Sequence, residues 1–152
     1  HTTLAPEFRQ DPTYARTGGE RLGRDGCRVP LPWEADGGKN FGFGPSDESW
    51  LPAPAIYGEY ARDRQTGVEG STLELYRSAL ALRSQLGLGE GTFEWLPDFV
   101  STAALGYRNG DLLVIHNFSE SDLVLPAGTP VLKSWVDDYS GKLPSNQTVW
   151  LK

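Results

Sequence analysis

Arg24, Asp25 and Arg28 lie close together in a stretch, residues 23–33, that is rich in glycine and proline. A guanidinium presents a planar fork of donors that can bind two oxygen atoms at once. Glycine permits tight turns, and proline fixes φ and favours extended geometry in the residue before it, so we expect a rigid loop here. Charges on a stiff loop are typical of a binding site. The alternative is a structural loop that its own Arg–Asp pairs hold in place.

This loop has the form R-D-x-x-R-[TV]-P-[ML]-x-W. It resembles the arginine-rich loop of α-glucosidases and oligo-1,6-glucosidases in glycoside hydrolase family 13, the α-amylase superfamily. The matching residues are Arg24, Asp25, Arg28, Pro30, Leu31 and Trp33. Residues 40–43, 49–52 and 71–83 also resemble that family, the last as the final helix of its catalytic barrel, so the resemblance covers nearly the whole chain. With Cys27 in the loop, the chain is most similar to the actinobacterial type.

The resemblance implies a C-terminal piece of an α-glucosidase-like enzyme. Residues 1–88 would be a remnant of the last βα unit of the TIM barrel, with its loop and final helix, and residues 89–152 the C-terminal antiparallel β-domain. The family's three catalytic carboxylates lie on earlier barrel strands, so we expect no catalytic residue here and no activity from this chain alone. The parent enzyme would be a retaining hydrolase acting on an α-glucoside or oligosaccharide, without a cofactor.

In the resembled family, an arginine of this loop pairs with an aspartate from another barrel loop and closes the pocket around the non-reducing glucose. The resemblance does not decide between Arg24 and Arg28. We expect Asp25 to orient an arginine rather than to touch sugar. Trp33 and Trp50 lie in loops, where their rings could line the ligand.

Paired carboxylates are a further test, because retaining glycosidases need two of them about 5 Å apart. The local clusters are Asp137 with Asp138, and Glu34 with Asp36. Neither lies in a motif, and adjacent residues on a strand point to opposite faces. We therefore expect neither cluster to be catalytic.

Histidine and cysteine give weaker indications. His1 and His116 would supply the two histidines of a copper-binding brace, but His116 alternates with apolar neighbours in a strand pattern, so we expect no metal site. Cys27 has no evident base nearby and is predicted to be a small buried packing residue. A lone cysteine forms no internal disulfide, which is compatible with a cytoplasmic location.

Composition excludes some partners. The net charge of −6 argues against nucleic acid and anionic membrane surfaces. No apolar run approaches the roughly 20 residues that span a bilayer. The 18 glycines and 11 prolines favour loops and strands, and we expect long irregular stretches at 1–22, with one short helical turn, and at 34–54.

A helix over residues 72–86 is the clearest local element, after weak helical character at 55–66. Ser71 and Glu74 have the spacing of a capping box. Its apolar positions form two neighbouring rows, Leu73, Tyr76 and Leu80, and Leu75, Ala79, Leu82 and Leu86. So wide an apolar face predicts packing against a large partner, either a barrel-bearing chain or a second copy of this chain.

After residue 91 the apolar period changes to two. Strands are expected at 91–96, 102–108, 111–117, 121–125, 130–136 and 147–151. Asn109-Gly110 predicts a type I′ hairpin turn, and the spacing predicts a mainly β fold with an antiparallel β-sandwich. We expect Trp95, Trp135 and Trp150 to pack inside it.

Two alternatives to the enzyme fragment stay open. One is a stand-alone carbohydrate-binding module, since exposed aromatic rings stack on sugars. The other is a protein-interaction module that associates through the helix at 72–86.

Overall fold

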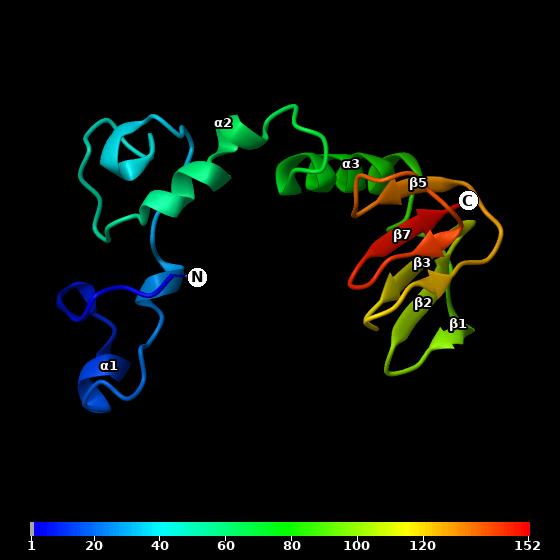
Figure 1. Ribbon diagram of the computed structural model, residues 1–152, viewed down its shortest axis with the longest axis horizontal. Helices are drawn as coiled ribbons and strands as arrows, with labels where there is room; N and C mark the ends of the chain where they lie inside the picture. Colours follow the sequence, from blue (N-terminus) through cyan, green and yellow to red (C-terminus); the bar gives the residue numbers. More distant parts are fainter. Residues whose placement is uncertain (1) are drawn as a thin grey trace. The chain divides into compact units, whose positions relative to one another are not determined.

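The computed structural model describes residues 2–152, which group into two compact units with a boundary between Val68 and Glu69 (Figure 1). The copper hypothesis involves His1, which lies outside the described residues. Within residues 2–152, no helix combines the length and the apolar character that a membrane crossing requires.

The first unit is built from short helical segments joined by loops. These are η1 (Pro6–Phe8), α1 (Pro12–Arg16), η2 (Asp25–Cys27), η3 (Gly38–Asn40), η4 (Ala55–Tyr60) and α2 (Arg62–Gln65), where η denotes a 3₁₀ helix. Leu4, Val29 and Leu51 form its small apolar core, with Ala53 and Tyr57 packed against it. The expected short helical turn before residue 22 is α1, and the weak helical pattern at 55–66 corresponds to η4 and α2.

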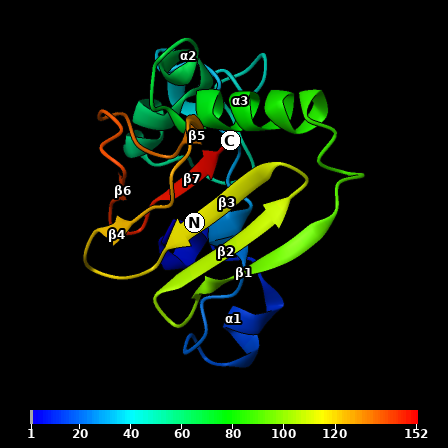
Figure 2. The same ribbon diagram turned by 90° about the vertical axis from the view of Figure 1, so that its right-hand side faces the viewer.

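The second unit is a β-domain whose strands follow a single helix in the sequence. Its elements are α3 (Thr72–Gln85), β1 (Phe93–Val100), β2 (Ala104–Asn109), β3 (Leu112–Asn117), β4 (Leu123–Val124), β5 (Pro130–Lys133), β6 (Lys142–Leu143) and β7 (Thr148–Leu151). Among the described residues, a five-stranded antiparallel sheet has the order β1-β2-β3-β7-β5, and β4 pairs with β6 in a small second sheet (Figure 2). The predicted mainly β, antiparallel fold is confirmed.

The two sheets share one apolar core. Ile115, Leu125, Leu143, Val149 and Leu151 are its buried members. Burying each such side chain contributes about 1.5–3 kcal/mol to folding. Two sheets with a common interior make the sandwich that the strand spacing predicts, although its second layer is only a two-residue pair and β6 was not expected from the sequence.

Asn117 connects the two layers by hydrogen bonds. It is 1% exposed, and its Nδ2 donates to the carbonyl oxygens of Ser121, Leu143 and Pro144 at 2.8, 2.9 and 3.1 Å. Its Oδ1 accepts from the backbone N–H of Ser119 at 3.0 Å. A buried amide with all these partners fixes the course of the chain after β3.

The hairpin between β2 and β3 differs in turn type from the prediction. Asn109 pairs with Leu112, so the turn residues are Gly110 and Asp111. Gly110 has φ +57°, whereas Asp111 is not in the left-handed region, and a type I′ turn needs both. The hairpin is correctly predicted, but its turn begins one residue later.

Helix α3 follows the expected pattern to within one residue at its end. Ser71 is its N-cap, and the Ser71 side chain accepts the backbone N–H of Glu74 at 3.2 Å. The Glu74 carboxylate accepts from Nη1 of Arg77 at 2.6 Å. None of the helix residues is buried, so α3 leaves much of its apolar surface uncovered.

Two expectations about packing are wrong. Trp95 is 56% exposed, because β1 is one of the two edge strands of the larger sheet and the indole lies on an open part of its face. Cys27 is exposed as well, since it ends the 3₁₀ turn η2 at the surface. Trp135, in contrast, packs against the core of the second unit as predicted.

Candidate functional site

Asp25 is the centre of the loop at residues 23–33. Its side chain is fully buried, and Oδ2 accepts the backbone N–H groups of Gln10 and Asp11, both at 2.7 Å. Oδ1 accepts from Nη1 of Arg28 at 3.2 Å. The 3₁₀ turn η2 begins at Asp25 and places Arg28 one turn later, which makes this contact local. Asp25 therefore anchors the loop and has no surface left for a ligand.

Asp11 is the second buried carboxylate, 6% exposed. As N-cap of α1 it accepts the N–H of Thr13 at 2.9 Å, and its other oxygen accepts the backbone N–H of Arg24 at 3.0 Å. That same oxygen lies 3.3 Å from Nη1 of Arg28. One arginine nitrogen thus bridges two buried carboxylates, Asp11 and Asp25.

Gly23 allows the loop to approach Asp11 this closely. Its φ is +71°, and a Cβ atom at this position would lie 2.5 Å from Cβ of Asp11. Both the left-handed backbone and the contact require glycine.

The two arginines of the motif have different environments. The Arg28 guanidinium is tied to Asp11 and Asp25, and its side chain is 35% exposed. The Arg24 side chain is 80% exposed, and only its Nε comes within 4.0 Å of Asp11. A surface pair at that distance contributes about 0–1 kcal/mol. Arg24 therefore keeps its guanidinium fork available, whereas Arg28 is used inside the protein.

Trp50 is linked to this cluster through Gln10. The indole Nε1 donates to Oε1 of Gln10 at 3.0 Å, and the backbone N–H of Gln10 donates to Asp25. The Trp50 ring is 60% exposed. The ring is thus held by its polar edge while most of its surface stays open, as in residues that stack on ligands.

Trp33, the last residue of the motif, is held by another set of bonds. Its backbone N–H donates to the carbonyl of Phe41 at 2.9 Å, and its carbonyl accepts the N–H of Asp63 at 3.1 Å. Its ring is 45% exposed. The structure therefore joins Asp25, Arg28 and Trp50 in one hydrogen-bonded cluster and places Trp33 in a neighbouring part of the loop system.

Sequence reasoning did not identify Gln10 and Asp11, which complete this cluster. Asp11 precedes Pro12, and an acidic N-cap before a proline is a strong helix start. That signal predicts the cap but not the contact with Arg28, 17 residues later in the chain.

Both buried carboxyl groups are held in the ionised form. Hydrogen bonds from the backbone N–H of Thr13 and then of Arg24 lower the pKa of Asp11 to about 2. The pKa of Asp25 is also lowered, first by the backbone N–H of Asp11, while desolvation opposes the shift. At neutral pH the cluster therefore holds two negative charges beside Arg28.

The acidic clusters considered from the sequence are open to solvent. Asp36 is 97% exposed in an ion pair with Arg64 at 3.9 Å, and Asp137 and Asp138 are exposed too. Within the described part of the chain, no three histidine, cysteine, aspartate or glutamate residues are grouped so as to hold a metal ion.

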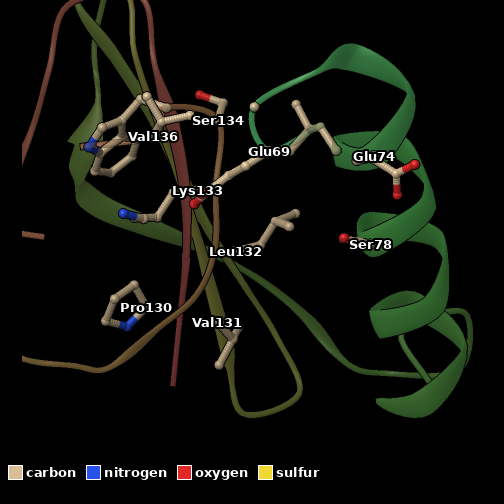
Figure 3. A pocket seen from close by; sticks show the side chains of 12 residues that line it. Glu69, Glu74, Ser78, Pro130, Val131, Leu132, Lys133, Ser134 and Val136 are labelled. Carbon is tan, nitrogen blue, oxygen red and sulfur yellow. The ribbon is translucent and has the colours of Figure 1, made fainter. Parts of the chain in front are cut away.

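The second unit contains a pocket of about 370 Å³ between α3 and β5. Figure 3 shows Glu74 and Ser78 of α3 opposite Leu132 and Lys133 of β5. Lys133 also lies over the ring of Trp135, with Nζ 5.4 Å from the ring centroid. No residue of the arginine-rich loop lines this pocket.

Known proteins similar to the chain include one named as an alpha-glucosidase, an alpha-glucosyl transfer enzyme and a trehalulose synthase. A probable alpha-glucosidase of Rhizobium meliloti (strain 1021) is 33% identical over 149 residues, covering 90% of this chain and 26% of that protein. The crystal structure of XgtA, an alpha-glucosyl transfer enzyme, superposes with a TM-score of 0.71 at 25% identity, covering 98% of this chain and 30% of that one. The R284C mutant of trehalulose synthase MutB superposes with a TM-score of 0.77 at 19% identity, covering 99% of this chain and 33% of that one.

No family profile matches the chain. The chain spans only about a quarter to a third of the length of these three relatives. By sequence and by fold, the chain is related to the α-glucosidase-like enzymes of glycoside hydrolase family 13 and corresponds to a C-terminal part of them.

Proposed function

We propose that the chain acts as the C-terminal part of an α-glucosidase-like enzyme, in which residues 1–88 complete the mouth of the substrate pocket and residues 89–152 brace the catalytic barrel. The identity to the Rhizobium relative along nearly the whole chain supports this proposal. The substrate of the complete enzyme is an α-glucoside or oligosaccharide, bound without a cofactor. We also propose a cytoplasmic location, since the lone Cys27 forms no internal disulfide.

The exposure of Arg24 is the observation that supports a substrate role for the loop. Arg28 and Asp25 hold the loop in shape, and Arg24 offers its free guanidinium to the sugar hydroxyls or to an acidic partner on the barrel. The open rings of Trp33 and Trp50 supply apolar faces for the sugar ring.

We further propose that the chain alone does not hydrolyse α-glucosides. Retaining hydrolysis needs two carboxyl groups about 5 Å apart, one of them a proton donor with a raised pKa. Asp25 of the loop and Asp11, the N-cap of α1, are buried carboxyl groups with lowered pKa values, and both are already bonded to Arg28 and the backbone. They are suited to hold the loop rather than to donate a proton.

A chimera tests the substrate role of Arg24. This chain replaces the matched segment of the Rhizobium relative, and hydrolysis of p-nitrophenyl α-glucoside is measured. Removing a charged hydrogen-bond donor costs about 1.5–3 kcal/mol, so Arg24→Ala should lower kcat/KM by about tenfold to a hundredfold. Arg21→Ala, which changes another exposed arginine of the same unit, is the matched control and should leave kcat/KM unchanged.

Two results would contradict the proposal. Turnover by the isolated 152-residue chain above a buffer control would show that it is catalytic by itself. Equal kcat/KM for the parent chimera and its Arg24→Ala variant would exclude Arg24 from substrate binding.

A stand-alone carbohydrate-binding module is the second candidate function, favoured by the exposed rings of Trp33 and Trp50. Titration of the isolated chain with maltose and isomaltose, followed by tryptophan fluorescence, separates the two functions. Saturable quenching that Trp50→Ala abolishes would favour the binding module, and a flat titration would favour the enzyme part.

A further inference from the structure

Five aromatic rings form a continuous row on one face of the larger sheet, and we call this row the ring strip. Its members are Phe93, Trp95, Tyr107, His116 and Phe118. Centroids of successive rings are 4.8 Å apart for the first pair, 6.3 Å for Trp95 and Tyr107, and 6.2 and 6.1 Å for the last two pairs. Such spacings are those of aromatic contacts in protein interiors.

Three of the five rings in the strip are nevertheless open to solvent. Phe93, Trp95 and Phe118 are 53%, 56% and 57% exposed. Single exposed apolar side chains are normal, but a contiguous row of large rings marks a surface that another body covers.

Helix α3 adds apolar surface to the same face. Leu75 and Ala79 line an apolar cavity of about 240 Å³ together with Leu132 and Trp150 of the sheet. Tyr76 borders the same cavity, and 65% of the residue is still exposed. A helix that is apolar on more than one side needs cover on more than one side, and the sheet supplies only one.

Strand register places α3 and the ring strip on one side of the sheet. Trp150 pairs with Val114, Val114 with Tyr107, and Tyr107 with Trp95, and directly paired antiparallel residues point to the same face. Figure 2 shows α3 beside β5 and β7, with β2 and β1 further along the sheet. The strip and the helix thus belong to one surface of this unit.

We propose that the ring strip, together with Tyr76 and Leu80 of α3, is the docking surface for the part of an α-glucosidase-like enzyme that this chain does not cover. Leu80, one turn after Tyr76, is 62% exposed. About two thirds or more of the length of the relatives lies outside the matched segment. This large part of the enzyme is the partner that covers the ring strip. The inference rests on the proposed function and names the surface through which the two parts join.

The ring geometry favours a protein surface over a glucan chain as occupant. Phe93 meets Trp95 at an interplanar angle of 88°, and Trp95 meets Tyr107 at 86°. Rings that interlock edge to face present ridges, whereas a sugar needs flat faces with hydrogen-bonding groups beside them. Nδ1 of His116 is already 2.8 Å from Oγ1 of Thr148. Interdigitating apolar side chains fit such ridges better.

Charge argues against a second copy as occupant. Each chain carries a net charge of −6, so two copies would bring twelve negative charges together. Like charges across an interface weaken association.

The experiment compares the same double variant, Trp95→Ser with Phe118→Ser, in two settings. In the isolated 152-residue chain the rings are exposed, so the variant should shift Tm by no more than about 3 °C. In the chimera with the Rhizobium relative, hydroxyl-radical labelling of Trp95 and Phe118 should fall about tenfold relative to the isolated chain, because a docked partner excludes water. The double variant should then lower the Tm of the chimera by more than that of the isolated chain.

Val124 provides the matched control. It is 71% exposed on β4, in the other sheet, so its labelling should be equal in both settings and Val124→Ser should leave both Tm values unchanged. Equal labelling of the ring strip in chimera and isolated chain would overturn the proposal, whatever the kinetics of the Arg24 variant. Two measurements on the isolated chain can overturn it as well: saturable binding of maltoheptaose that Trp95→Ser abolishes, or a dimer in sedimentation equilibrium that the double variant dissociates.

Discussion

Arg24 and Arg28 have the same side chain and lie four residues apart, yet the structure gives them different environments. The difference comes from Asp11 and Asp25, whose buried oxygens both accept from Nη1 of Arg28. Buried carboxylates need such partners, so Arg28 is committed to the fold. Arg24 donates its backbone N–H to Asp11, and its side chain, whose Nε lies 4.0 Å from Asp11, stays 80% exposed.

Lowering the pH should destabilise the first unit through Asp11. The pKa of Asp11 is about 2 in the folded protein, compared with 3.8 for an unperturbed aspartate in the unfolded chain. The unfolded chain therefore binds the proton more tightly. The stabilisation is complete above pH 3.8 and is lost as the pH falls toward 2. Between pH 5, 3 and 2, the urea midpoint of unfolding should fall less for Asp11→Asn than for the unchanged chain. Asparagine keeps an N-cap side chain at this position. Parallel curves for both proteins would contradict this assignment.

Glycine at position 23 is a steric requirement, and Gly18 offers the comparison. Both have positive φ, but a Cβ at Gly18 meets nothing within 4 Å, whereas a Cβ at Gly23 meets Asp11. Left-handed strain alone costs about 1–2 kcal/mol, which is what Gly18→Ala should lose. Gly23→Ala must also displace Asp11, so its free energy of unfolding in urea should fall further. Equal losses of free energy of unfolding in the two variants would show that Asp11 moves away from the new Cβ atom without cost.

At the scale of elements, sequence patterns predict those helices and strands that are stabilised by interactions between residues close in sequence. Ser71 and the spacing of leucines define α3, and alternation defines β2 and β3, because each signal lies within one element. The exposure of Trp95 and Cys27 depends on neighbours distant in sequence, and those predictions are wrong. The different environments of Arg24 and Arg28 depend on Asp11 in the same way, so the motif predicts the loop but not which arginine packs against the buried carboxylates.

The junction of the two sheets depends on Asn117. Replacing it by aspartate keeps its shape but removes the NH₂ group that donates to three carbonyl oxygens. Leaving buried groups unpaired costs about 1–3 kcal/mol each, so Asn117→Asp should lower the free energy of unfolding by at least about 2 kcal/mol. Asn146→Asp, at an exposed position with φ +56°, is the control and should change it little. If Asn117→Asp left the free energy of unfolding unchanged, water would have to replace these hydrogen bonds.

His116 should give the β-domain a second pH dependence. Desolvation lowers its pKa below 6.5, so the unfolded state takes up the proton first. The stabilisation is present above pH 6.5 and is lost as the pH falls through the folded pKa. NMR titration of the imidazole should give a pKa below 6.5, and His116→Gln should flatten the urea midpoints between pH 7.5 and 5. An imidazole that titrates at 6.5 or higher would contradict the burial of this ring.

At the scale of the whole molecule, the division into two units predicts unequal stability. The core cluster of the first unit is formed by three buried residues, Leu4, Val29 and Leu51, whereas that of the second has five, supported by paired strands. Free energy of unfolding follows buried apolar area, and a small core leaves little surplus over the loss of chain entropy. We therefore expect the first unit to open at lower urea concentration.

Hydrogen exchange followed by mass spectrometry measures this difference along the chain. Peptides from residues 2–68 should exchange through openings of lower free energy than those from β2, β3 and β7. Leu51→Ala, which removes a fully buried side chain at a cost of about 2–5 kcal/mol, should accelerate exchange in the first unit and leave the sheet unchanged. If the variant accelerated exchange equally in both units, the chain would unfold as one cooperative body. The arginine-rich loop would then draw on the stability of the β-domain rather than on its own small core.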